Sequence, residues 1–499
     1  MSFFNYNINS IYQFDVVNDI AFLLPEIFIF IALMIIIFYS SFYSNLNIYK
    51  YVKIAYPLLN LVCLICGLYI ILVLNSVSYN NIISSYLLYN DNSIVFLKVF
   101  FSLLLIILIK ISYNYLLCKN IKNFELYIFF LISLISLILL IMSYDFIMAY
   151  LSIELQGLCS YIMVAMNKSN NKSMESSLKY FVLGSFASSL LLLGIALIYW
   201  STGMSNFKDI SDLMQLSLGL EFFDQIFLLG ILFVTVGLFF KISVAPFHLW
   251  LPDVFYGSSK VIVLFFSLLP KIGLLTLFFK LHYLLLIKSN LDSKHFYIYF
   301  IILSLIFGIS GALKVDKLNK LIAYSSITHM GFILCTILTN SLNIFLIFIV
   351  IYSLILISIF IVFLSLINPL TGKSINNINQ LIYLKKINYI FFISLILSFF
   401  SISGIPPLSG FFSKFFIFLS LVNYNWNLLT LIMLLFSVIS CFYYLRVIKL
   451  VSFNNSKNWF LIDVLDKNLS YILGFSILIN ISLYLLIPFM WEIFYYIIH

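Results

Sequence analysis

Titratable side chains inside long apolar segments are the residues of this sequence best suited to do chemistry. A charge near the centre of a bilayer costs several kcal/mol, so such residues usually face a protein interior or a water-filled cavity and mark an ion or proton path. Because intervening water can carry protons between neighbouring titratable groups, the set indicates proton transfer across an apolar barrier. Its members are Glu154, Lys179, Lys241, Lys271, His329 and Lys414.

Glu154 is the only glutamate near the middle of an apolar segment. An uncompensated carboxylate at that depth should take up a proton or find a cation such as Lys241. Closing or opening a contact between them would switch Lys241 between holding and releasing its proton. His329 could relay protons between lysines, since neutral imidazole both donates and accepts a hydrogen bond.

Each of these residues also has an ordinary structural explanation. Glu154 could be protonated and hydrogen-bonded to a neighbouring helix, and His329 could be a packed side chain that donates to a carbonyl. Lys179 lies about one turn inside its segment, and Lys241 could lie near a helix end, so both could extend to the membrane surface. The sequence alone leaves both kinds of explanation open.

Two apolar segments contain helix breakers close to a lysine. The breakers are Pro246 in the first segment, and Gly404, Pro406 and Pro407 in the second. Proline lacks a backbone N–H and clashes with the preceding turn, so we expect breaks beside Lys241 and Lys414. The freed carbonyls can line a polar cavity.

The bulk composition defines the class of protein that holds these residues. Of 499 residues, 64% are hydrophobic and 9% are charged, with a mean hydropathy of +1.14. Apolar runs long enough to cross a bilayer repeat along the chain, which predicts an all-α polytopic membrane protein. The net charge of +9 is spread over short loops, so it does not indicate nucleic-acid binding. Cys63 and Cys66 form a C-x-x-C without a second pair, which favours buried thiols over a metal site.

Hydropathy predicts about fourteen spans, with the seventh and twelfth broken. The breaks lie five spans apart. Because five is an odd number of membrane crossings, the second copy of a five-helix repeat begins on the opposite side and is inverted. We therefore expect two inverted five-helix repeats. The predicted units are an N-terminal three-helix segment at 1–122, repeats at 123–290 and 291–455, and a C-terminal helix at 456–499.

The loop lysines give an independent test of this count. Most basic residues fall in odd-numbered loops, whereas the even-numbered loops hold few, among them Lys98 and Lys280. By the positive-inside rule the odd loops face the inner compartment and both termini face the outer one. Glu26 lies near a span end, so we expect it at the interface. No Walker A or dinucleotide-binding motif and no cysteine set for an iron–sulfur cluster is present.

Several blocks of the sequence resemble a known family. In order, and over nearly the whole chain, they are YLSIELQGLCSYIMVA, LKYFVLGSFASSLLLLGIALIYWSTG, GLFFKISVAPFHLWLPDVFYG, LLPKIG, NKLIAYSSITHMGF, SISGIPPLSGFFSKFF and CFYYLRVIK. Together they resemble the subunit 2 family of the proton-pumping NADH:ubiquinone oxidoreductase, respiratory complex I. The APFHLWLPD and AYSSITHMGF blocks favour subunit 2 over the other antiporter-like subunits.

The resemblance implies a fold, a location and a set of partners. It implies fourteen helices in the membrane arm, in the mitochondrial inner membrane, among other membrane-arm and accessory subunits and structural lipids. By position, its ion-pair glutamate corresponds to Glu154 and its lysines to Lys179, Lys241, Lys271 and Lys414. It also implies that NADH, FMN, iron–sulfur clusters and ubiquinone belong to partner subunits, with no cofactor or metal in this chain. One departure is the SSKVIV run after Tyr256, where the family usually has a proline and an acidic residue.

Three functional hypotheses follow. The leading one is a proton-translocating subunit of complex I, part of an enzyme whose redox centres lie in other chains. The second is a cation/proton antiporter subunit without redox coupling, which the same buried charges would serve. The third is a structural scaffold of the membrane arm.

Overall fold

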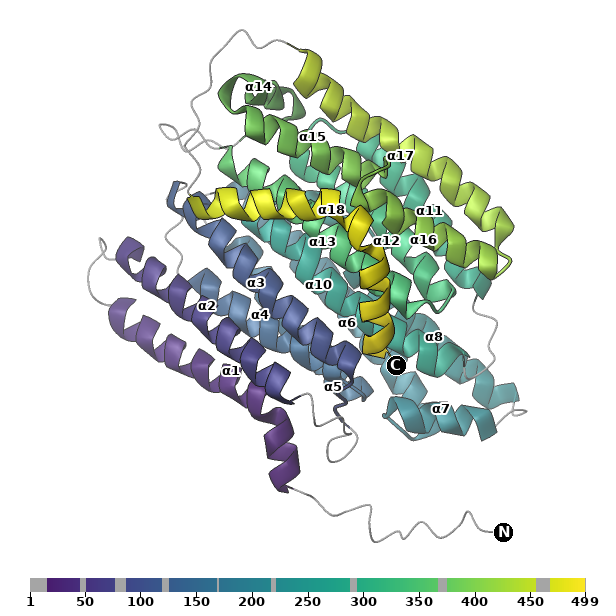
Figure 1. The fold of residues 1–499 in the computed structure, drawn as a ribbon. Helices are drawn as coiled ribbons and strands as arrows, with labels where there is room; N and C mark the ends of the chain where they lie inside the picture. The colour runs from purple at the N-terminus through teal and green to yellow at the C-terminus, as the bar shows by residue number, and fades with distance from the viewer. Residues whose placement is uncertain are drawn as a thin grey trace.

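The computed structural model describes residues 16–44, 51–76, 87–118, 125–167, 170–216, 221–287, 294–366, 375–454 and 467–498. Within these ranges the chain is a bundle of helices (Figure 1). The first half contains α1 Val16–Ser44, α2 Tyr51–Asn75, α3 Asn92–Cys118, α4 Glu125–Met142, α5 Phe146–Ala165, α6 Asn171–Thr202, α7 Phe207–Leu216, α8 Glu221–Ile242, α9 Trp250–Gly257 and α10 Lys260–Leu281.

The second half continues the bundle. It contains the π-helical turn His282–Ile287, α11 Lys294–Lys314, α12 Leu318–Leu338, α13 Leu342–Ser365, the 3₁₀ helix Ile378–Tyr383, α14 Leu384–Ile387, α15 Tyr389–Ser403, α16 Ser409–Asn423, α17 Asn427–Phe453 and α18 Lys467–Ile498. Twelve of the described helices are long and apolar enough to cross a membrane. The broken α15–α16 pair and the apolar α18 complete the architecture, which confirms the predicted all-α polytopic fold.

The predicted boundaries at 122/123, 290/291 and 455/456 lie outside the described residues, as do the two chain ends. The division into the units 1–122, 123–290, 291–455 and 456–499 therefore stays a prediction.

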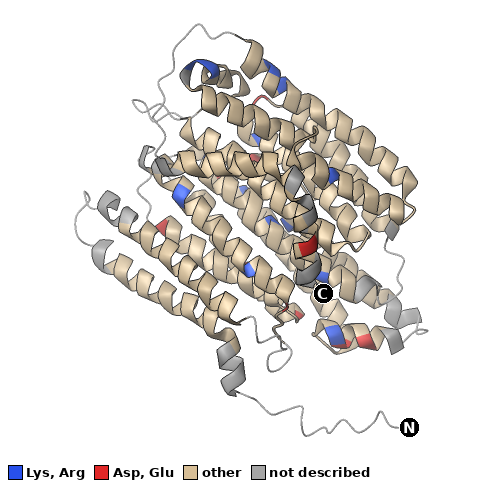
Figure 2. Ribbon diagram, in the orientation of Figure 1, with Lys and Arg blue, Asp and Glu red and all other residues tan. Residues whose placement is uncertain are grey.

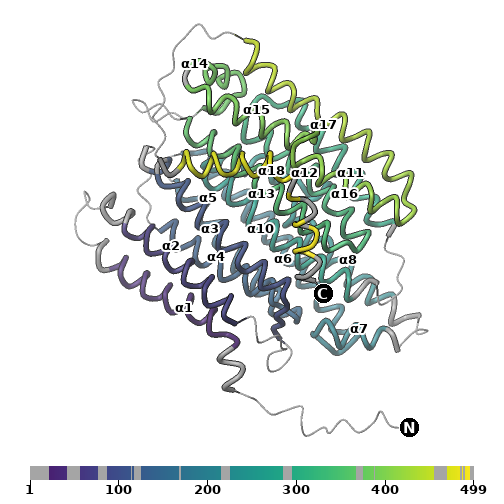
Figure 3. Tube along the Cα trace, viewed as in Figure 1, coloured from purple at the N-terminus to yellow at the C-terminus, as the bar shows by residue number. Residues whose placement is uncertain are grey.

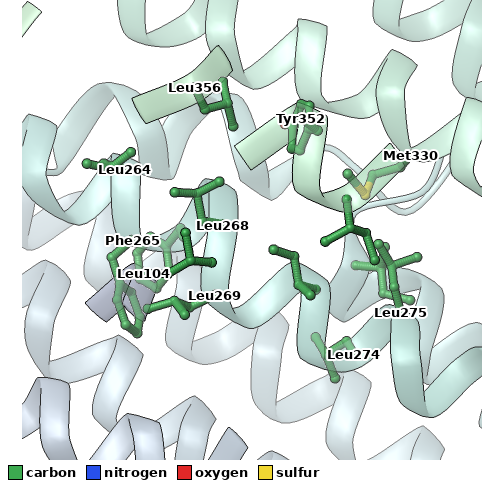
Figure 4. Packing of buried hydrophobic residues seen from close by; sticks show 14 of the residues in the cluster. Leu104, Leu264, Phe265, Leu268, Leu269, Leu274, Leu275, Met330, Tyr352 and Leu356 are labelled. Carbon is green, nitrogen blue, oxygen red and sulfur yellow. The ribbon is translucent and has the colours of Figure 1, made fainter. Parts of the chain in front are cut away.

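Helix α10 lies at the centre of the bundle and is buried along its whole span. The tube trace shows it between the purple and blue N-terminal helices and the green helices of the second half (Figure 3). Its apolar side chains pack against α3, α12 and α13, where Leu268 and Leu275 lie near Leu104, Met330 and Leu356 (Figure 4). The faces of α10 around its middle are thus covered, so Lys271 can reach only protein or internal water.

Both predicted breaks are present. Helix α8 ends at Ile242, Ser243 has φ 70°, the Ala245–Pro246 peptide is cis, and α9 begins at Trp250. The Trp250 indole N–H donates to the Phe240 carbonyl over 2.9 Å, which satisfies a group that the break would otherwise leave exposed.

The second break separates α15 from α16. Gly404 caps α15 at φ 88°, in the left-handed region that favours glycine, and the Pro406–Pro407 peptide is cis. The Ser403 carbonyl at the end of α15 accepts a hydrogen bond from Lys414 Nζ over 2.8 Å. A lysine therefore satisfies backbone that the break has freed.

Two loop assignments were wrong. Lys98 lies inside α3, buried, and pairs with Glu26 over 2.8 Å; Lys280 lies inside α10 and donates to the Ser143 carbonyl over 2.6 Å. Glu26 is 9% exposed at this pair and lies near the start of the candidate span Phe22–Ser41, so its place at the membrane interface stays a prediction. Both lysines were assigned to loops because hydropathy considers only neighbouring residues, whereas the partners that allow these lysines to be buried lie far away in the sequence.

Candidate functional site

A half-buried ion pair joins α5 to α8. Lys241 Nζ lies 2.7 Å from Glu154 Oε1, with side-chain exposures of 8% and 26%. Asp145 caps the N-terminus of α5 by accepting from the Ile147 N–H, and this cap fixes the start of the helix that carries Glu154. Lys241 lies in the last turn of α8, where the helix dipole favours a cation. The predicted Glu154–Lys241 contact is therefore formed in this structure.

A small cavity lies between Lys241 and Lys271. It has a volume of about 20 Å³, and both lysines line it. A water molecule needs about 10–15 Å³ and two to four polar partners. Gln156, Tyr161 and Tyr180 also line the space, and Gln156 Nε2 is buried without a partner in the described chain. The cavity therefore has the size and the polarity to hold a bridging water.

Lys271 leads from this cavity to α12. Its Nζ donates to Ser326 Oγ over 2.8 Å, and the lysine is buried. Ser326 and His329 are three residues apart on α12, so they lie on the same face of the helix. A polar path therefore continues from α10 into α12.

His329 lies deep in the second half of the bundle. Its Nε2 is 3.3 Å from the Tyr444 hydroxyl on α17, and its Nδ1 is buried without a partner among the described residues. Both Lys271 and Lys414 are close enough to act electrostatically on it. Its helix neighbours contact both lysines, since Ser326 accepts from Lys271 and the Phe332 ring lies under Lys414.

Lys414 is buried at the second helix break. Its Nζ donates to the Ser403 carbonyl and lies 5.4 Å from the centroid of the Phe332 ring on α12. Cys441 Sγ is 3.3 Å from the same carbonyl. Hydrogen bonding within the break therefore anchors this lysine.

Lys179 lies apart from the other residues. Its side chain is 46% exposed and pairs with Glu175 over 2.8 Å and with Asp253 over 3.5 Å. Asp253 also pairs with Lys320. The structure thus brings Lys179 to a surface ion-pair network and not to the buried row.

Sequence reasoning missed the small polar residues of this site. Gln156, Ser326 and Tyr444 connect the charged groups. Polar side chains within apolar spans were the signal that could have found them. Many serines in these helices, however, only donate to a carbonyl of their own helix. From the sequence, the few polar residues that bond across helices cannot be told apart from these serines. Figure 2 shows how sparse the charged residues are within the tan helices.

No group of three or more His, Cys, Asp or Glu side chains that could hold a metal occurs in the described ranges.

Comparison with known proteins identifies the family. Residues 143–440 match the family model described as "NADH:quinone oxidoreductase/Mrp antiporter, TM". The NADH-ubiquinone oxidoreductase chain 2 of Marchantia polymorpha is 34% identical over 470 residues, covering 92% of this chain and 94% of that relative. The NADH-quinone oxidoreductase subunit N of Pelagibacter ubique is 35% identical over 448 residues, covering 88% and 91%.

Solved structures share the fold at low sequence identity. A chain of respiratory complex I from Thermus thermophilus superposes with a TM-score of 0.77 at 20% identity, covering 94% of this chain and 98% of that one. A chain of the Mrp complex from Dietzia sp. gives a TM-score of 0.76 at 15% identity, covering 95% and 96%. With the family match and the full-length relatives, these findings show that the chain belongs to the NADH:quinone oxidoreductase/Mrp antiporter family, as a chain 2 or subunit N type membrane subunit of complex I.

Proposed function

We propose that this chain carries protons across the membrane along its buried row of titratable residues. The route runs from Glu154 to Lys241, through a water to Lys271, and then through His329 to Lys414. Lys179, which pairs with exposed acidic residues, lies at the surface beside this route. The route crosses the bundle through α5, α8, α10, α12 and α16.

The observation that carries the proposal is the cavity shared by Lys241 and Lys271 next to the Glu154 ion pair. While Glu154 pairs with Lys241, the carboxylate compensates the positive charge of the ammonium group, so Lys241 keeps its proton. When the contact opens, the uncompensated ammonium in an apolar interior favours release of a proton toward the cavity and Lys271. Movement of one carboxylate can therefore gate the first transfer.

The energy for this movement comes from partner subunits in the proposal. The relatives are named as subunits of NADH:quinone oxidoreductases, so NADH, FMN, iron–sulfur clusters and ubiquinone would act in other chains and not in this one. Other membrane-arm and accessory subunits and structural lipids would cover its exposed apolar helices. Glu154 is partly exposed, so a conformational change in an adjoining subunit could reach it directly.

The proposed location is the mitochondrial inner membrane. The plant relatives named as NADH-ubiquinone oxidoreductase chain 2 and the loop charges support this location. The lysine-rich loops would face the matrix, and both termini would face the intermembrane space.

A cation/proton antiporter without redox coupling is the second candidate, favoured by the shared fold with the Mrp complex chain. Proteoliposomes that contain the assembled complex separate the two. The proposed function predicts NADH-driven proton uptake that stops when NADH is exhausted. Cation-driven proton exchange at the same rate without NADH would instead support the antiporter.

Lys271→Met provides a direct test of the route, because the variant removes a buried charge and keeps most of the volume. We expect fewer protons translocated per NADH oxidised, while NADH oxidation in the assembled complex continues. Lys385→Met, at an exposed lysine of α14, is the matched control and should leave the ratio unchanged. An unchanged ratio in Lys271→Met would favour the scaffold role.

A further inference from the structure

A second, larger cavity lies where α6, α10 and α12 begin. Its volume is about 170 Å³, several times the roughly 30 Å³ that one water occupies in the liquid. Lys172, Lys260 and Lys317 line it, and no Asp or Glu does so in the described part of the chain. Lys260 Nζ already donates to the Phe363 carbonyl over 2.7 Å, so Lys172 and Lys317 make this a cationic site, separate from the row that carries Lys241.

Three helix N-termini converge on this cavity. The lining includes Asn170 and Lys172 from the start of α6, Ser259 and Lys260 from the start of α10, and Lys317 and Asn319 from the start of α12. The N-terminus of a helix carries a partial positive charge and free backbone N–H groups, so it favours anions. Asn170 already caps α6 by accepting from the Lys172 N–H, and the Leu318 N–H of α12 donates to the Asn376 carbonyl over 2.9 Å. Helix α10 has no side-chain N-cap hydrogen bond.

Packing around Tyr256 fixes the position of two of the lysines. Gly257 approaches α6 so closely that an added Cβ would lie 2.5 Å from the Lys172 carbonyl. Lys172 Nζ donates to the Tyr256 hydroxyl over 2.9 Å, and Lys317 Nζ lies 3.8 Å from the centroid of its ring. Neither lysine has an ion-pair partner among the residues that the structure describes.

The carboxylate one turn from Tyr256 is already engaged elsewhere, and one hydroxyl is unsatisfied. Asp253 pairs with Lys320 over 3.3 Å and with Lys179. Ser258 lines the cavity, is 6% exposed, and its buried Oγ has no hydrogen-bond partner in the described chain. Since buried polar groups normally have partners, this hydroxyl is an independent sign that a ligand belongs here.

We propose that this cavity binds a phosphate group, supplied by an anionic lipid headgroup or by free phosphate. A phosphate presents several acceptor oxygens in tetrahedral directions and one or two negative charges, which matches the ammonium groups of Lys172 and Lys317 beside the uncapped start of α10. The site goes beyond the proposed proton route and does not depend on it.

Tyr256 gives the site a pH dependence. Hydrogen bonds from Lys172 and then Lys317 lower the pKa of its phenol to about 8. The other charged groups around it are Lys320, Lys260 and, one turn earlier on α9, Asp253. Below pH 8 the phenol is neutral and the lysines remain available, whereas above pH 8 the phenolate neutralises part of their charge. Binding of a phosphodiester, whose own charge is constant in this range, should therefore weaken as the pH rises through 8.

The test uses the assembled complex, purified in detergent and delipidated. Binding of ³²P-labelled inorganic phosphate is measured by equilibrium dialysis, and binding of ³²P-labelled phosphatidylglycerol is measured in phosphatidylcholine nanodiscs. We expect saturable binding of one or both ligands at one site per chain. Phosphatidylglycerol alone would assign the phosphate to a lipid headgroup, and inorganic phosphate alone would assign it to the free ion.

The double variant Lys172→Gln/Lys317→Gln should lower the affinity at least about tenfold, because each lost charge-assisted hydrogen bond accounts for roughly that factor. Lys385→Gln/Lys449→Gln removes two exposed lysines outside the cavity and should stay within about twofold of wild type. Native gel electrophoresis checks assembly of both.

Tyr256→Phe keeps both lysines, so it tests the site without removing its charge. This variant should bind at pH 7 and lose the weakening above pH 8. Binding of neither ligand by the wild type, or an equal loss in the two double variants, would overturn the proposal. Where phosphatidylglycerol binds, an affinity that does not change between pH 7 and pH 9 would overturn the role assigned to Tyr256.

Discussion

Lys241 and Lys414 lie on opposite sides of their helix breaks, Lys241 at the end of α8 before the first break and Lys414 near the start of α16 after the second, and they have different partners. Lys241, in the last turn of α8, pairs with the Glu154 carboxylate, whereas Lys414 donates to the carbonyl that ends α15. Helix C-termini favour cations, so both breaks stabilise a buried ammonium group. Only Lys241, however, has a charged partner that can move away, which makes it the residue at which proton transfer can be gated.

A double-mutant cycle on the ion pair tests this coupling. Glu154→Gln or Lys241→Met alone leaves one buried charge without its partner, which typically costs about 3–5 kcal/mol. The double variant removes both charges, so the thermal stability of the assembled complex should recover most of that loss. Proton translocation should not recover. Additive losses of stability in the double variant would show that the two side chains are not coupled.

Gln156 offers a second test at the scale of single residues. Gln156→Leu replaces the amide that lines the cavity with an apolar side chain and should exclude water between Lys241 and Lys271. We expect normal assembly and a lower ratio of protons to electrons. Leu274→Val, which changes another lining residue without removing a polar group, should retain the wild-type ratio. Equal ratios in the two variants would argue against a bridging water.

Depth within an apolar segment was enough to identify Lys241, Lys271 and Lys414 from the sequence. It failed for Lys98 and Lys280, which hydropathy assigned to loops. Their burial depends on Glu26, 72 residues away, and on the Ser143 carbonyl, 137 residues away. Pairing at such separations leaves no local pattern, so it becomes visible only once the helices are packed.

The helix breaks are the elements that could be predicted best. Pro246 and the Gly404–Pro407 run disfavour a continuous helix, because proline lacks the backbone N–H and clashes with the preceding turn. Proline alone does not decide the outcome, since Pro270 lies inside the unbroken α10. The packing of α15 against α16 was not predictable, because it depends on a close approach of residues that are not adjacent in the sequence. Gly410 shows this, since a Cβ there would lie 1.8 Å from the Ser401 carbonyl oxygen. The start of α16 therefore packs directly against the end of α15.

Gly410→Ala should force these two fragments apart. Overpacking of this kind costs on the order of 1–3 kcal/mol, and the contact here is with backbone that cannot rotate away. The melting temperature of the assembled complex should fall, and NADH-driven proton translocation should fall with it. Gly67→Ala, at a glycine of α2 with open space around it, is the control and should leave both unchanged. Tolerance of Gly410→Ala equal to that of Gly67→Ala would contradict the packing.

At the scale of the molecule, central helices are buried and peripheral ones expose apolar faces. Helices α10, α12 and α13 are covered almost completely, whereas α17 exposes Leu428, Val438 and Phe442. Exposed apolar surface of this size is explained by lipid or by partner subunits. The overall arrangement was predictable from hydropathy, but the choice between lipid and protein at each face was not.

The proposed orientation can be tested by labelling. Lys386→Cys places an exposed thiol on α14, in a lysine-rich connection. Tyr424→Cys places an exposed thiol at the C-terminal end of α16, which the predicted topology puts on the other side of the membrane. A membrane-impermeant maleimide should label Lys386→Cys only from the matrix side and Tyr424→Cys only from the intermembrane-space side. The unsubstituted chain provides the background from its own cysteines. Labelling of both from one side would contradict the predicted topology.

The proton-to-electron ratio of an assembled complex carrying both Lys241→Met and Lys414→Met tests the proton route most directly. The measurement compares NADH oxidation with proton uptake in proteoliposomes, beside a Lys385→Met control. The proposed route predicts full assembly and continued NADH oxidation with a lower ratio in the double variant and a wild-type ratio in the control. A wild-type ratio in a fully assembled double variant would contradict the route and leave the chain a structural role.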